Sequence, residues 1–135
     1  WRSKACRIGF TNGCFDLLHP GHLALLAAAK ECCDKLIVAV NSDASVKLLK
    51  GESRPIMDEA SRAGILESLP FVDAVIIFDE QTPAHLIEAI MPDNLIKGGD
   101  YIAEDVIGYQ TVTSAGGTVD IITLKAGHST TALLD

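Results

Sequence analysis

The fold can be inferred from residues 11–22, which read Thr11-Asn12-Gly13-Cys14-Phe15-Asp16-Leu17-Leu18-His19-Pro20-Gly21-His22. An apolar run at residues 8–10 precedes this segment, and a run of helical character at residues 23–30 follows it. The order predicts a strand whose carboxyl end turns directly into the start of a helix. Open α/β sheets bind ligands at such turns, and the free N–H groups of a helix start attract phosphate.

The rest of the chain repeats the same alternation of apolar runs and helical segments. Strands are predicted at residues 7–11, 35–40, 74–78, 94–97 and 119–122. Helices are predicted at residues 21–33, 44–49, 59–69, 83–91 and 104–115, with caps at Asp58 and Thr82 and an interruption at Gly108. We therefore expect an α/β fold: a Rossmann-like, open, parallel five-stranded sheet of order 3-2-1-4-5, with helices on both faces.

Composition narrows the classes of function. The chain has 135 residues, which suits one domain, and a net charge of −7, which argues against general nucleic-acid binding. No run of about 18 apolar residues and no leader pattern occurs, so we expect no membrane association and a cytoplasmic location. The four cysteines are then expected to be free thiols.

Residues 11–22 resemble the H-x-G-H signature of the cytidylyltransferase-like nucleotidyltransferases, with His19-Pro20-Gly21-His22 as its core. The longer string is most similar to the adenylyltransferase domain that makes ADP-heptose for lipopolysaccharide. Two further segments, residues 92–101 and 127–131, are similar to the same family at the expected places. The resemblance extends over nearly the whole chain, from about residue 7 to residue 134.

The resemblance implies a set of site residues. His19, His22 and Lys50 would be catalytic, and Asp16 and Asp100 would contact the substrate. The nucleotide and its phosphates would be bound by Thr11, Asn12, Gly13, Cys14, Phe15, Gly21, Arg62, Lys97, Gly98, Ser129, Thr130 and Thr131. On local chemistry alone, Arg62 could equally be an exposed helical arginine, and Gly98-Gly99-Asp100 an ordinary turn.

These side chains favour one kind of chemistry. No nucleophile is paired with a base, and neither a Walker lysine motif nor G-x-G-x-x-G occurs. Phosphate binders remain, and they suit direct, in-line nucleotidyl transfer, in which the protein positions two anions and stabilises the charge on the leaving group. We expect Mg²⁺ to arrive with ATP and not at a fixed protein site. The alternative, that His19 and His22 ligate a metal, lacks an evident third ligand nearby.

The resemblance therefore predicts transfer of AMP from ATP to D-glycero-β-D-manno-heptose 1-phosphate, giving ADP-heptose and pyrophosphate. One alternative is cytidylyl transfer to glycerol 3-phosphate or another small phosphate ester. Another is a non-catalytic nucleotide-binding module. Related enzymes are often dimers and are often fused to a sugar kinase, so a homodimer is an expectation. Residues 1–135 are expected to form one nucleotidyltransferase domain, excised from or partnered with such a kinase.

Overall fold

Five parallel strands form one sheet in the computed structural model, which describes residues 6–15, 20–51, 53, 57–99 and 101–123. The strands are β1 (Ile8–Gly13), β2 (Lys35–Asn41), β3 (Ala74–Phe78), β4 (Asn94–Gly98) and β5 (Thr118–Ile122). Their order is β3-β2-β1-β4-β5, and every neighbouring pair is parallel. The predicted order is confirmed, and β1 lies at the centre of the sheet.

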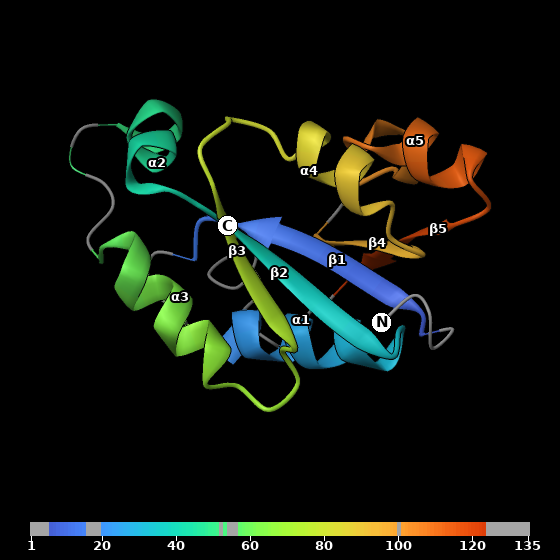
Figure 1. Cartoon of the computed structure of the whole chain (residues 1–135), viewed down its shortest axis with the longest axis horizontal. Coiled ribbons are helices and arrows are strands. Elements are labelled where there is room, and N and C mark those ends of the chain that lie inside the picture. Colours follow the sequence, from blue (N-terminus) through green and yellow to red (C-terminus); the bar gives the residue numbers. More distant parts are fainter. Residues whose placement is uncertain (1–5, 16–19, 52, 54–56, 100, 124–135) are drawn as a thin grey trace.

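Helices cover both faces of this sheet, as predicted (Figure 1). The helices are α1 (Pro20–Glu31), α2 (Asp43–Lys50), α3 (Glu59–Glu67), α4 (Ala84–Ile90), α5 (Tyr109–Ser114) and the short 3-10 helix η2 (Ala103–Asp105). Helices α1 and α3 lie on one side of the sheet, and α4 and α5 lie on the other. The central strands are therefore covered from both directions, which explains the continuous apolar run at residues 36–40 of β2.

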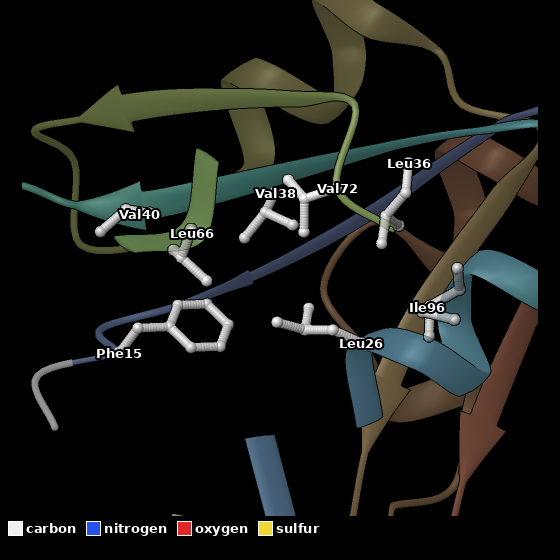
Figure 2. Packing of buried hydrophobic residues seen from close by; sticks show 9 residues of the cluster. Phe15, Leu26, Leu36, Val38, Val40, Leu66, Val72 and Ile96 are labelled. Atoms are coloured by element: carbon white, nitrogen blue, oxygen red, sulfur yellow. The ribbon is translucent and has the colours of Figure 1, made fainter. Parts of the chain in front are cut away.

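The two sides of β2 contribute to two separate hydrophobic clusters. Leu36, Val38 and Val40 pack with Leu26 of α1 and Leu66 of α3 (Figure 2). The intervening residues of β2 face the other way and join the cluster formed with α4 and α5. This alternation is the period of two that a strand imposes on its side chains. The first cluster also includes an aromatic ring from the loop after β1, so the core and that loop are packed together.

The interruption predicted at Gly108 is confirmed, whereas the predicted start of the fourth helix needs correction. Residues 104–115 form a 3-10 turn followed by a six-residue helix, and Gly108 takes a left-handed φ of 97° between them. The helix predicted to be capped by Thr82 starts at Ala84, with Pro83 at the N-cap position and no side-chain capping bond. In contrast, Asp58 caps α3 as predicted, and its carboxylate accepts the backbone N–H of Ser61.

Aspartate side chains bind backbone N–H groups at and beside the amino ends of the strands. Asp93 accepts from the backbone of Ile8, the first residue of β1. Asp73 accepts from the backbone of Leu36 in β2, and its carboxylate also pairs with Lys30 of α1. These bonds join the strands to the preceding loops and helices at the amino ends of the strands. The signature loop, within residues 11–22, follows the opposite, carboxyl end of β1.

Replacing Asp73 with asparagine should lower the free energy of unfolding by about 2 kcal/mol at neutral pH, because it removes charge-assisted hydrogen bonds. Burial raises the pKa of Asp73, but the bonds and charge of Lys30 and the Leu36 N–H outweigh burial and hold this pKa below its usual 3.8. The stabilisation is therefore complete above about pH 4 and is lost as the pH falls through the lowered value.

Urea unfolding of the wild-type and Asp73→Asn proteins at pH 7 and pH 3 measures this effect. The difference in the free energy of unfolding between the two proteins should be smaller at pH 3 than at pH 7. The exposed Asp79, replaced in the same way, is the control and should change stability little. Equal losses at Asp73 and Asp79 would contradict the assignment.

Candidate functional site

The described part of the signature loop, residues 14 and 15, follows the carboxyl end of β1, and β4 is a neighbour of β1. The two strands are neighbours, with Phe10 aligned to Leu95. Gly98, the last residue of β4, packs against α1 so closely that an added Cβ would lie 2.9 Å from Leu25 Cδ1. The second turn of α1 is thus held against the end of β4, next to the ends of the strands where an open α/β sheet has its ligand site.

His22 lies in the first turn of α1 and is only 7% exposed. Its ring meets Phe15 edge to face, with centroids 5.4 Å apart and planes at 66°. Phe15 itself has a φ of 47°, a left-handed conformation that is costly for a bulky residue. Gly13 makes room for the aromatic ring, because a Cβ there would lie 2.9 Å from Phe15 Cε2. The loop is therefore shaped around the contact between Phe15 and His22.

Arg62 of α3 is 1% exposed, so it is not the exposed helical arginine that sequence alone allowed. Its guanidinium donates to the backbone oxygens of Cys14 and Asn41, each at 2.7 Å. It also donates to the backbone oxygen of Met57 at 3.0 Å and pairs with the carboxylate of Asp43 at 2.8 Å. These contacts do not test phosphate binding by Arg62, which stays a prediction.

Asn41 and Asp43 are residues of this site that the sequence did not single out. Asn41 ends β2 and is buried; its side chain accepts from Cys14 Sγ at 3.7 Å and donates to Ser45 Oγ at 2.8 Å. Asp43 begins α2 and pairs with Arg62. The available signal was their position, since polar residues that directly follow a buried strand often line a site.

The two predicted lysines are placed differently. Lys97 lies in β4 near its carboxyl end, and its ammonium group stands over the ring of Tyr101, 5.0 Å from the centroid. Lys50 is the last residue of α2 and is exposed. It lies about 10 Å along the helix axis from Asp43, given a rise of 1.5 Å per residue. The catalytic role of Lys50 stays a prediction.

Some of the remaining predicted site residues lie within the residues that the structure describes, and the others lie outside them. Thr11 is buried in β1, Asn12 is half-buried in β1, and Gly21 is buried in α1. Six candidates lie outside the described residues: Asp16, His19, Asp100, Ser129, Thr130 and Thr131. The structure therefore brings Phe15 next to His22, and Gly98 at the end of β4 next to Leu25 of α1, whereas the placement of residues 129–131 stays a prediction.

The described residues set limits on other kinds of site. Within the described ranges, no group of three or more His, Cys, Asp or Glu side chains gathers as it would around a metal ion. Across the same ranges, no helix is both long and apolar enough to span a membrane. The assembled chemistry is that of a helix start with a buried imidazole in its first turn, which suits an anionic ligand.

Comparison with known proteins agrees with this geometry. A family model described as cytidylyltransferase-like matches residues 10–131. The chain is 58% identical to the bifunctional protein HldE of Bradyrhizobium sp. (strain ORS 278) over all of its 135 residues. It is 57% identical over 134 residues to HldE of Caulobacter sp. (strain K31), covering 99% of this chain. It spans 28% of the length of each of these relatives.

Solved structures share the fold. A lipopolysaccharide core biosynthesis protein from Thermoplasma volcanium GSS1 matches with a TM-score of 0.71 and 28% identity, covering 89% of this chain and 97% of that one. A pantoate-β-alanine ligase from Francisella tularensis matches with a TM-score of 0.65, 18% identity and coverage of 93% and 62%, which shows the fold alone. With the model match over residues 10–131 and the signature loop at the carboxyl end of the central strand, the chain belongs to the cytidylyltransferase-like family of nucleotidyltransferases.

Proposed function

We propose that this chain transfers AMP from ATP to D-glycero-β-D-manno-heptose 1-phosphate, producing ADP-heptose and pyrophosphate. The observation that carries the proposal is the placement of His22, buried in the first turn of α1 at the carboxyl end of the central strand. The choice of substrate is supported by the extended signature at residues 11–22 and by the 28% identical structure described as a lipopolysaccharide core biosynthesis protein.

The reaction needs little covalent chemistry from the protein. An oxygen of the sugar phosphate attacks the α-phosphorus of ATP, a new P–O bond forms, and the bond to the β-phosphate breaks as pyrophosphate leaves. Because the attacking oxygen is already anionic, no base has to remove a proton from it. The protein positions two anions and stabilises charge in the transition state.

The residues take distinct roles in this proposal. His22 donates a hydrogen bond to the α-phosphate, and His19 does the same from the other end of the signature. The first-turn N–H groups of α1 and the Ser129–Thr131 segment bind the remaining phosphate oxygens. Lys50 and Lys97 supply positive charge, while Asp16 and Asp100 hold the sugar. Mg²⁺ bound to the phosphates of ATP offsets the negative charge of the leaving group.

The substrate is identified by measuring pyrophosphate release from every pairing of ATP, CTP or GTP with heptose 1-phosphate or glycerol 3-phosphate, in the presence of Mg²⁺. Release only with ATP and heptose 1-phosphate is expected. Release only with CTP and glycerol 3-phosphate would instead support the second candidate, which the name of the matched family favours. A nucleotide that binds without any release would point to a non-catalytic module.

A second activity in the same polypeptide is part of the proposal. The relatives are described as bifunctional, and this chain spans 28% of their length. A sugar kinase would supply the sugar 1-phosphate that the present domain consumes. We also propose that the domain acts as a homodimer in the cytoplasm, which size-exclusion chromatography with light scattering would test for the oligomeric state.

A further inference from the structure

Arg62 connects three segments of the chain: the loop after β1, the junction of β2 with α2, and the residues just before α3. Four of its five N–H groups donate hydrogen bonds to protein oxygens. Those oxygens belong to the loop after β1 (Cys14), the end of β2 (Asn41), the start of α2 (Asp43) and the residue before the α3 cap (Met57). A buried guanidinium needs such partners, because an unpaired charge in the interior is strongly destabilising.

The bond from Arg62 to Cys14 bears directly on the histidine. Cys14 precedes Phe15, whose strained left-handed backbone needs surrounding contacts to hold it. The ring of Phe15 packs into the core beside Leu66, one turn beyond Arg62 on α3 (Figure 2). The same ring meets His22 edge to face. Helix α3 thus holds both the backbone before Phe15 and the side chain of Phe15.

We propose that Arg62 is a positioning residue for His22, acting through Cys14 and Phe15, and that it does not bind phosphate. Its geometry supports this reading. Both N–H groups of Nη1 are used by the oxygens of Cys14 and Asn41, and Nε is used by Met57. The Nη2 group is paired with the carboxylate of Asp43. Arg62 is 1% exposed, and turning Nη1 toward a phosphate would break its bond to Cys14 in the loop after β1.

The first test is spectroscopic and uses the ligand-free protein, so it stands apart from the proposed function. The four histidines give ring-proton resonances that can be assigned by comparison with His22→Ala. Arg62→Lys, which keeps the charge but cannot make the same bonds, should move the His22 resonances because the ring of Phe15 shifts. Arg7→Lys is the matched control, since Arg7 donates to Asn94 Oδ1 at the amino end of β4. Unmoved His22 resonances in Arg62→Lys would overturn the proposal.

The second test is kinetic and rests on the proposed function. Arg62→Lys should lower kcat by roughly tenfold to a hundredfold, as expected for a small misplacement, and should leave the KM for ATP nearly unchanged. In a His22→Ala background the same substitution should lower kcat little further, because the two residues act in one chain of contacts. Additive losses, or a raised KM for ATP as the main effect, would show direct phosphate binding and refute the proposal.

A further variant keeps the test decisive if Arg62→Lys does not fold. Phe15→Leu leaves Arg62 intact but removes the ring that contacts His22. It should reproduce the fall in kcat with little change in KM. Normal kcat in Phe15→Leu would refute the path through Phe15. If the wild-type protein releases no pyrophosphate in any pairing, the proposed function fails, while the resonance shift still decides the role of Arg62.

Discussion

Replacing His22 with alanine is expected to lower kcat for pyrophosphate release by a factor of roughly 100 to 1,000. His22 lies in the first turn of α1 and is only 7% exposed. Loss of one preorganised donor to developing charge typically has an effect of this size. The KM for ATP should change much less, since the helix-start N–H groups remain in place.

The control for this prediction is His85→Ala. His85 lies on α4, its side chain is 79% exposed, and its described partner is Glu80. It should retain wild-type kinetics. Far-UV circular dichroism and a urea unfolding curve would establish that His22→Ala is folded. A folded His22→Ala protein with near-normal kcat would show that the histidine is not part of the catalytic machinery.

Replacing Leu66 with alanine should lower the free energy of unfolding by about 3 kcal/mol. Leu66 is fully buried between α3 and the sheet, in the cluster that also contains Phe15 and Val40 (Figure 2). The substitution loses the transfer free energy of the removed carbons and leaves a cavity, and buried Leu→Ala changes usually fall between about 2 and 5 kcal/mol. Urea unfolding with a fixed m-value measures the effect.

Leu48 provides a matched control because it undergoes the same chemical change on a helix. It lies on α2 and is 69% exposed. Leu48→Ala should change the free energy of unfolding by no more than about 0.5 kcal/mol. Similar losses at Leu48 and Leu66 would mean that α2 buries its apolar side in solution, contrary to the arrangement described above.

The positions of the strands could be predicted from the sequence because strands buried on both faces have continuous apolar runs. The strand at residues 74–78 was predicted with its exact bounds, and β2 differs by one residue. The order of the strands follows from the doubly wound arrangement, with the signature loop at its centre. The break at Gly108 was predicted, since glycine takes a positive φ more readily than other residues. The start of α4 was predicted one residue too early, with Thr82 as its cap, because a residue type that favours a cap does not show that the capping bond forms.

The site was only partly predictable for a related reason. His22 and the loop before it form a contiguous motif, so the sequence places them next to each other. The surroundings of Arg62 are different, since three of its four described partners are backbone oxygens, at residues 14, 41 and 57. Any residue type supplies a backbone oxygen, so no sequence pattern marks these positions as partners. The burial of Arg62 becomes visible only when the three segments meet in space.

The aspartates at the amino ends of the strands have a practical consequence for protein engineering. Asp73 and Asp93 secure the amino ends of the strands, opposite the loop after β1. Substitutions that raise thermal tolerance can therefore be sought around those amino ends without touching the loop that contacts His22. Conversely, substitutions meant to change the nucleotide preference can be made at the carboxyl ends of the strands. Such substitutions often lower the free energy of unfolding, and stabilising changes at the amino ends can offset that loss.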